Sequence, residues 1–137
     1  MSDERLFLDT VFIQAVLNKR DQYHHQAKAF LPRVRAARSV WITEAILVEV
    51  GNALGAVNRP GTVQFIQQCY ETANLQVVTV DTSLLTRALQ LYSERPDKTW
   101  GLTDCISFTV MWEKSLTDAV TADLHFVQAG FRALLRE

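Results

Sequence analysis

Four acidic residues of this sequence lie where α/β proteins commonly carry out chemistry, directly after apolar strands or in the first turns of helices. These residues are Asp9, Glu49, Asp104 and Asp123. Four carboxylates that converge repel one another unless they are protonated or neutralised by cations. Hard divalent ions such as Mg²⁺ or Mn²⁺ prefer ligand sets made of oxygen atoms. A divalent-metal site is therefore the first hypothesis.

Three of the four acids have an ordinary alternative role, and the fourth is harder to explain. Asp9 and Asp123 could simply cap the helices that follow them, and the helix dipole favours Asp104 in a first turn. Glu49 lies inside an apolar run, where only a narrow part of the helix surface is available to water. Asn52 is three residues further along the same helical face. A carboxylate and an amide on an otherwise apolar face indicate a polar pocket.

The apolar pattern places these residues on alternating strands and helices. Short β-rich runs predict five strands, at residues 6–8, 40–42, 75–80, 119–121 and 131–135. Longer runs with helical spacing predict helices at 11–17, 21–38, 44–57, 62–72, 82–94, 104–114 and 124–129. This alternation favours the α/β class, a three-layer α/β/α sandwich with a central, mostly parallel sheet. Ligands bind at the carboxyl ends of such strands, so the acids are expected at one edge.

Particular residues are expected to begin, bend or end these helices. The expected N-caps are Thr10, Asp21, Thr43, Asp81 and Thr103. Pro32 should kink the second helix or split it in two. The segment 58–61 (Asn-Arg-Pro-Gly) is the clearest helix breaker in the chain. Gly130 is expected just after the last helix, where a left-handed conformation is common.

Length and composition limit the class of protein. The 137 residues and 15.6 kDa predict one domain spanning 1–137, long enough to bury a core without disulfides. Hydrophobic residues make up 48% of the chain, and it contains only 5 Gly and 3 Pro, which excludes a disordered or linker-rich chain. Its 14 basic and 15 acidic residues give a net charge of −1. This excludes a strongly basic polyanion binder but not a local basic face.

The cysteines and the apolar runs indicate the cellular compartment in which the protein is expected. Cys69 and Cys105 lie in no metal-binding or disulfide spacing, so reduced thiols in a cytoplasmic protein are expected. The first five residues do not have the pattern of a signal peptide. No apolar run approaches the roughly 18 residues of a membrane helix, so no membrane association is expected.

Four segments of the chain, in this order, resemble the PIN-domain family of ribonucleases. They are residues 6–10, 43–50, 102–105 and 120–126. The likeness is greatest to the small single-domain members that act as VapC-type toxins in toxin–antitoxin pairs. It covers essentially the whole chain, including the ending 129–131 (Ala-Gly-Phe). The ordered set, at these spacings and in a chain of this length, is quite specific.

The resemblance implies a function and a set of site residues. The four acids match the family's metal-binding residues and would hold one or two Mg²⁺ or Mn²⁺ ions. Thr121 matches a position where a hydroxyl could hold a carboxylate or a water molecule, and Thr10 could act similarly, whereas Asn52 adds only weak support. The implied enzyme is an endoribonuclease that leaves a 5′-phosphate and a 3′-hydroxyl. The implied partners are RNA, a cognate antitoxin protein and a second copy of the chain, as a homodimer.

Several alternatives stay open or are excluded by missing residues. A catalytically inactive PIN-like module that binds RNA or a protein remains the alternative function. A haloacid-dehalogenase phosphatase needs Asp-x-Asp after its first strand, and here Thr10 and Val11 follow Asp9. The glycine patterns of P-loop and Rossmann nucleotide sites are missing. A response-regulator receiver lacks its acidic pair before the first strand's final Asp and its late Lys.

Other residues have two interpretations of similar weight or a structural one that is preferred. Adjacent His24 and His25 point about 100° apart on a helix, so a solvated surface is preferred to a shared metal ion. His125 lies near the last acid but could equally be packing or capping. Trp100, in a predicted loop, is the best aromatic candidate for a substrate or partner contact. The basic segment 19–38 could be a solvated helix face or an RNA-facing one.

Overall fold

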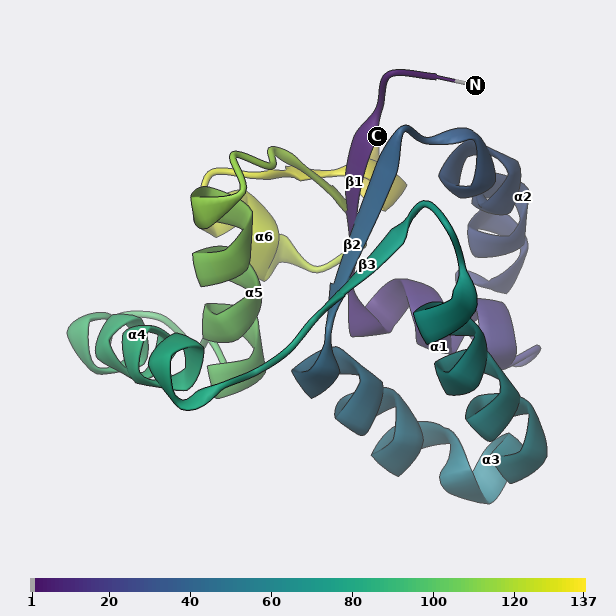
Figure 1. Ribbon diagram of the computed structural model, residues 1–137, viewed down its shortest axis with the longest axis horizontal. Coiled ribbons are helices and arrows are strands. Elements are labelled where there is room, and N and C mark those ends of the chain that lie inside the picture. Colours follow the sequence, from purple (N-terminus) through teal and green to yellow (C-terminus); the bar gives the residue numbers. More distant parts are fainter. Residues whose placement is uncertain (1) are drawn as a thin grey trace.

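A parallel five-stranded sheet lies between two layers of helices in the computed structural model, which describes residues 2–137 (Figure 1). The strands are β1 (Arg5–Leu8), β2 (Ser39–Thr43), β3 (Leu75–Val78), β4 (Asp118–Val120) and β5 (Arg132–Ala133). Their order is β3-β2-β1-β4-β5, and each neighbouring pair is parallel. The predicted α/β/α sandwich is confirmed.

The helices cover both faces of this sheet. They are α1 (Thr10–Leu17), α2 (His24–Ala36), α3 (Glu44–Glu71), α4 (Thr82–Glu94), α5 (Leu102–Glu113) and α6 (Leu124–Gln128), followed by a 3₁₀ turn at Leu134–Arg136. In Figure 1, α1, α2 and α3 lie on one side of the sheet and α4, α5 and α6 on the other. Central strand β1 is therefore buried on both faces, which explains its unbroken apolar run of Leu6, Phe7 and Leu8. No helix among residues 2–137 is both long and apolar enough to cross a membrane.

The strand order creates one crevice at the carboxyl end of the sheet. The chain runs outward from β1 to β2 and β3, and then crosses to the other side of β1 to form β4. Strands β1 and β4 pair in register, with Leu8 opposite Val120. The residues that follow these two strands therefore emerge side by side, at the position where open α/β sheets commonly bind ligands.

Helix α2 differs from its prediction in its start and its continuity. It begins at His24 with Tyr23 as its N-cap, so the predicted cap at Asp21 is wrong by two residues. The Asp21 carboxylate instead accepts a 2.8 Å bond from the Tyr23 N–H in a preceding turn. Pro32 lies inside the helix without splitting it. Pro32 and Lys28 are both exposed, so water can reach the Lys28 carbonyl that loses its helical partner.

The predicted break after residue 57 is confirmed as a sharp bend within α3. Asn58 has non-helical backbone angles, and helical structure resumes directly afterwards. The Asn58 side chain accepts a 3.0 Å bond from the Gly61 N–H, and the Thr62 hydroxyl donates to the Asn58 carbonyl at 2.7 Å. A side chain at Gly61 would overlap the Asn58 amide, which explains the glycine.

The remaining differences concern helix caps and the last strand. Thr43 and Asp81 cap their helices as predicted, and Gly130 has the expected positive φ of 96°. The N-caps of α1 and α5 are Asp9 and Gly101, so the predictions for Thr10 and Thr103 are wrong by one and two residues.

The predicted strand 131–135 is shorter than expected. Only Arg132–Ala133 pairs with β4, and the chain then turns into the 3₁₀ segment. Leu134 and Leu135 are nevertheless buried. The apolar pattern predicted their burial correctly but not their conformation.

Candidate metal centre

A threonine hydroxyl joins two of the predicted acids where β1 and β4 end. Asp9 follows β1, and Thr121 follows β4. The Thr121 hydroxyl donates to Oδ2 of Asp9 at 2.8 Å and accepts from the Asp123 N–H at 3.0 Å. Thr121 is fully buried and Asp9 is only 5% exposed. The hydroxyl therefore fixes both the Asp9 carboxylate and the backbone that carries Asp123.

Asp104 and Asp123 come together around the imidazole of His125. Oδ2 of Asp104 lies 2.9 Å from His125 Nδ1, which is also 3.4 Å from Oδ1 of Asp123. Each acid is held by a helix start: Asp104 accepts from the Gly101 N–H at 3.1 Å, and Asp123 accepts from the His125 N–H at 2.9 Å. One ligand atom from each of the three side chains lies within 4.8 Å of the other two.

Glu49 reaches the edge of this group, and Asn52 does not. The Thr10 hydroxyl donates to Oε1 of Glu49 at 2.7 Å, which ties the exposed Glu49 side chain to the residue beside Asp9. Asn52 lines a groove with Val48 that Glu49 does not line. Asn52 projects about 60° around the helix from Glu49, and this turn separates them. The polar pocket expected around Glu49 and Asn52 stays a prediction.

The acids that converge here carry unfavourable charge. Burial raises the pKa of Asp9 to about 7, the charges of Asp104 and Asp123 add to the rise, and the Thr121 bond opposes it. Burial and the neighbouring Asp123 also raise the pKa of Asp104, although bonds from Gly101 and His125 oppose this. Among residues 2–137, no Lys or Arg nitrogen lies within 4.0 Å of these carboxylates.

This set of donors fits a divalent cation. Buried carboxylates without a basic partner are costly, and a bound cation removes that cost. Carboxylate oxygens suit Mg²⁺ and Mn²⁺, and the imidazole of His125 adds a nitrogen donor that Mn²⁺ accepts more readily than Mg²⁺. The side chains whose donor atoms lie close enough together to share an ion are Asp104, Asp123 and His125. Asp9 is linked to them through the Thr121 hydroxyl, and Glu49 is linked to Thr10.

Sequence comparison identifies the family. The PIN domain family matches residues 6–132. The chain belongs to the PIN-domain family. The resemblance of the four ordered segments is thereby confirmed. A comparison with curated proteins gave no match.

Solved structures share the fold of this PIN domain. VapC20 of Mycobacterium tuberculosis, described as a sarcin–ricin loop cleaving toxin, has a TM-score of 0.83 and 23% identity over 93% of this chain and 96% of that one. FitAcB of Neisseria gonorrhoeae has a TM-score of 0.64 and 16% identity, over 93% and 95%. VapBC2 of Rickettsia felis, bound to a promoter DNA fragment, gives 0.59 and 13%, over 92% and 93%. These likenesses show a common fold.

Sequence reasoning undervalued one residue of the PIN domain, His125. Its Nδ1 bridges Asp104 and Asp123, and its Nε2 lies 3.1 Å from the Thr99 hydroxyl. The Asp-x-His spacing was the available signal, since it makes His125 the second residue of a helix whose N-cap is Asp123. Thr99 had no such signal, because only the fold brings the loop before α5 against α6.

Trp100 and His24 each make a hydrogen bond within the PIN domain. Trp100 is buried, and its Nε1–H donates to Gln128 at 3.0 Å. His24 is not simply solvated, since its Nδ1 lies 2.8 Å from the Ala15 carbonyl oxygen.

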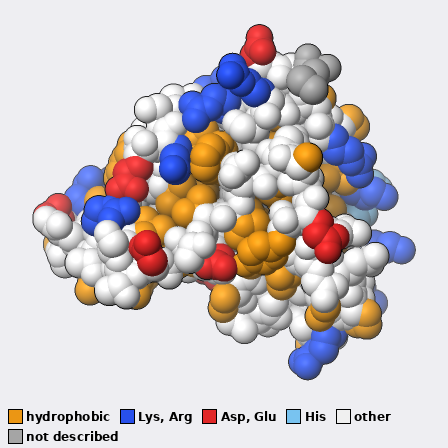
Figure 2. Space-filling view, in the orientation of Figure 1, with side chains coloured by type: hydrophobic (Ala, Val, Ile, Leu, Met, Phe, Trp, Pro, Cys, Tyr) orange, Lys and Arg blue, Asp and Glu red, His pale blue; other side chains and the backbone are white. Residues whose placement is uncertain are grey.

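One basic residue of the segment 19–38, Arg33, lies away from the metal centre. Arg33 pairs with Glu4 at 2.7 Å, at the amino end of the sheet. Figure 2 likewise shows basic side chains spread along several edges of the visible face. Of the two interpretations, a solvated face fits the part of the segment around Arg33.

Proposed function

We propose that this PIN domain is a metal-dependent endoribonuclease that hydrolyses RNA phosphodiester bonds. The observation that carries the proposal is the group of buried and half-buried acids at the β1–β4 crevice, which among residues 2–137 contacts His125 but no Lys or Arg side chain. Asp9, Glu49, Asp104 and Asp123 would hold one or two Mg²⁺ or Mn²⁺ ions. The proposal takes residues 1–137 as one nuclease domain in the cytoplasm.

In this proposal, some residues of the centre bind the metal ions and others hold the binding side chains in position. When bound, the divalent ions supply the positive charge that activates water and stabilises the phosphate oxygens. Asp104 and Asp123 would present carboxylates to the ions, while Thr121 holds Asp9 in place and His125 contacts Asp104. Water oxygen bonds to phosphorus as the bond to the 3′-oxygen breaks, and that oxygen takes a proton. The products are a 5′-phosphate and a 3′-hydroxyl.

We also propose that the nuclease is the toxin of a type II toxin–antitoxin pair. The support is the likeness of fold to VapC20, FitAcB and VapBC2, together with the sequence resemblance to VapC-type toxins. A protein antitoxin and a homodimer belong to the same proposal. Exposed apolar side chains on α3 and α4, among them Val48, Tyr70 and Leu89, offer surface for such contacts.

The cleavage assay compares Asp104→Asn with Asp118→Asn. Both remove one carboxylate, but Asp118 lies at the opposite end of β4, where it contacts Arg132. With Mg²⁺ or Mn²⁺ and a single-stranded RNA, we expect Asp104→Asn to lose more than about 100-fold in kcat/KM, because even partners of metal ligands contribute 10- to 100-fold. Asp118→Asn should cleave like the parent. EDTA should abolish cleavage by the parent.

Three outcomes would contradict these proposals. Binding of RNA without metal-dependent cleavage would support the inactive PIN-like module instead. Cleavage by Asp104→Asn at the parent rate would contradict the assignment of Asp104 to the metal site. For the toxin role, expression should arrest growth, and an adjacent gene should encode a protein that relieves the arrest. Harmless overexpression with no such neighbour would contradict that role.

A further inference from the structure

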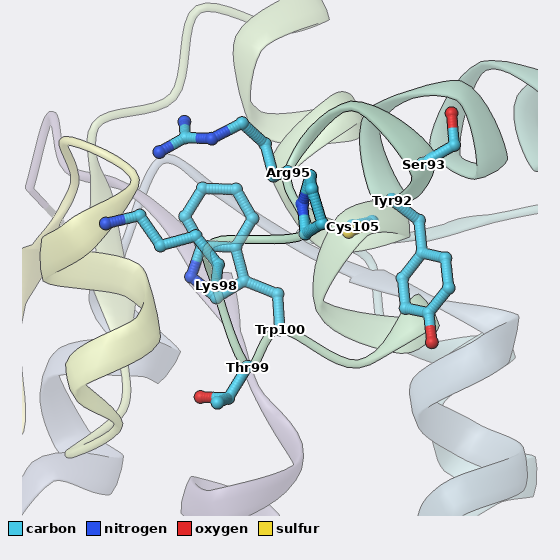
Figure 3. A pocket seen from close by; sticks show the side chains of 8 residues that line it. Tyr92, Ser93, Arg95, Lys98, Thr99, Trp100 and Cys105 are labelled. Atoms are coloured by element: carbon cyan, nitrogen blue, oxygen red, sulfur yellow. The ribbon is translucent and has the colours of Figure 1, made fainter.

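A cavity of about 520 Å³ opens beside the metal centre, between the end of α4 and the loop 95–101 (Figure 3). Its lining includes Tyr92, Arg95, Lys98, Thr99 and Trp100. In Figure 3 the Arg95 and Lys98 side chains lie beside the Trp100 ring, and the Tyr92 ring lies apart from them, beyond Cys105. The nuclease mechanism described above uses none of these side chains directly.

The cavity shares a wall with the metal centre. Thr99 lines the cavity, and its hydroxyl lies 3.1 Å from Nε2 of His125. The other nitrogen of the same imidazole contacts Asp104 at 2.9 Å. Cys105, the residue after Asp104, also lines the cavity. A polymer bound at the centre could therefore continue into the cavity without leaving the surface.

The charges of the cavity favour an anion. Among residues 2–137, Lys98 has no acidic partner within 4.0 Å, so its ammonium is available to a ligand. Arg95 pairs with Asp97 at 3.0 Å, and its guanidinium lies 5.1 Å from the centre of the Trp100 ring. Lys98 therefore carries the free positive charge of this wall.

The floor of the cavity is held rigidly. Trp100 is only 5% exposed, its Nε1–H donates to Gln128 at 3.0 Å, and its ring meets Phe108 edge-on at 5.0 Å. It is thus a fixed surface rather than a free stacking platform. Tyr92 is 48% exposed and is the aromatic side chain that a base could contact.

We propose that this cavity binds a nucleotide of the substrate RNA that neighbours the cleaved bond. Lys98 contacts a backbone phosphate, and Tyr92 provides a face for the base. The inference rests on the proposed nuclease function and specifies where its substrate strand runs. Single-stranded nucleic acid suits the site because such strands are bound by combining cationic side chains with aromatic faces. An acidic peptide could also meet Lys98, but it would make no use of an aromatic face.

The first test measures binding of a short single-stranded RNA by fluorescence anisotropy in Mg²⁺, in the Asp104→Asn background that prevents cleavage. We expect Lys98→Ala to weaken binding about 10-fold and to lower the slope of log Kd against log salt by about 0.7, the value for one phosphate contact on a single strand. Lys98→Arg should restore both. Lys28→Ala, on α2, is the matched control and should change neither.

The second test uses cleavage kinetics and the aromatic wall. With Asp104 restored, Lys98→Ala should raise KM about 10-fold and leave kcat unchanged. Tyr92→Ala should weaken RNA binding by at least about 5-fold, whereas Tyr92→Phe should bind like the parent. Melting temperatures in EDTA check that the variants fold.

The outcomes separate this inference from the proposed function. If the parent cleaves RNA and Lys98→Ala matches it in KM and in salt slope, the subsite is wrong and the nuclease function stands. If the parent neither binds nor cleaves RNA, both are wrong. If Lys98→Ala weakens binding of polyglutamate but not of RNA, the cavity is a peptide site and the inference is overturned.

Discussion

The two ends of the sheet surround their carboxylates differently. At the amino end, the Arg33 guanidinium donates to Glu4 through Nε at 2.8 Å and Nη2 at 2.7 Å. Arg132 lies 3.5 Å from Asp118 and also pairs with Glu137. These bonds hold the pKa of Glu4 and of Glu137 below the usual range.

At the carboxyl end, the acids are crowded and lack such partners. Asp9 is only 5% exposed, and burial raises the pKa of both Asp9 and Asp104. The cationic side chain in contact is His125, which is charged only when protonated. Arginine side chains thus neutralise the carboxylates at the amino end of the sheet. At the carboxyl end, where a divalent cation is proposed to bind, the carboxylates contact His125 instead. Their surroundings, rather than their number, distinguish the two groups of acids.

The largest expected effect is on stability, from Asp9→Asn without metal. The pKa of Asp9 is about 7 in the folded chain and about 3.9 when unfolded. Between those values the folded state keeps a proton that the unfolded state releases, so the free energy of unfolding falls as pH rises and levels off above 7. Asparagine avoids this loss and can still accept the Thr121 bond. We expect Asp9→Asn to be more stable at pH 8 by up to about 4 kcal/mol.

Urea unfolding in EDTA, at pH 4 and pH 8, measures this difference. Near pH 4 the two proteins should be about equally stable, because Asp9 is then protonated in the folded state. Saturating Mn²⁺ should narrow the gap at pH 8, since the ion stabilises the parent more than the variant. An Asp9→Asn protein that is less stable than the parent at pH 8 would show that the ionised Asp9 carboxylate does not destabilise the folded chain.

The next effect concerns the threonine hydroxyls at opposite ends of β4. Thr121 donates to Asp9 at 2.8 Å, and Thr117 donates to Asp118 at 3.2 Å. We expect Thr121→Val to weaken Mn²⁺ binding about 10- to 100-fold, because partners of metal ligands commonly contribute that much. Thr117→Val should leave Mn²⁺ binding unchanged. Calorimetric titration measures both affinities.

Thermal unfolding in EDTA provides the control for Thr121→Val. Loss of the hydroxyl also leaves the Asp123 N–H without its acceptor, so some loss of stability is expected. If Thr121→Val and Thr117→Val lowered the Mn²⁺ affinity equally, the hydroxyl beside Asp9 would have no special part in metal binding.

The fold was largely predictable because its signals are local. The apolar run of β1, the breaker at 58–61 and the caps at Thr43 and Asp81 each act within a few residues. The predictions that failed depended on neighbours distant in sequence. The chain after residue 133 turns away from the sheet while Leu135 donates its N–H to the Thr121 carbonyl at 3.1 Å, and no local pattern contains that contact.

The site was predictable in its residue types but not in its geometry. Strand ends and a topological switch bring Asp9 and Asp123 to one crevice. The same rule says nothing of rotation about a helix axis, so the polar pocket expected around Glu49 and Asn52 stays a prediction. The bridge from Thr99 through His125 to Asp104 joins three separate elements. Such a bridge follows from packing and could not be deduced from spacing.

The smallest expected effect has the opposite pH dependence and comes from Glu4→Gln at the amino end. The pKa of Glu4 is lowered, chiefly by its bond from Arg33, so this pair stabilises the folded chain above about pH 4.5 and ceases to do so as pH falls through the folded pKa. Both side chains are partly exposed, so we expect a loss of only about 0.5 kcal/mol at pH 7.

Urea unfolding across pH 3 to 8 distinguishes Glu4→Gln from Asp9→Asn by sign. The glutamine variant should be slightly less stable than the parent at pH 7 and equal to it near pH 3, and added salt should reduce the difference. Cleavage and Mn²⁺ affinity should not change. If Glu4→Gln instead became more stable as pH rose, the amino end would strain its carboxylates as the carboxyl end does, and position in the sheet would no longer separate structural from metal-binding acids.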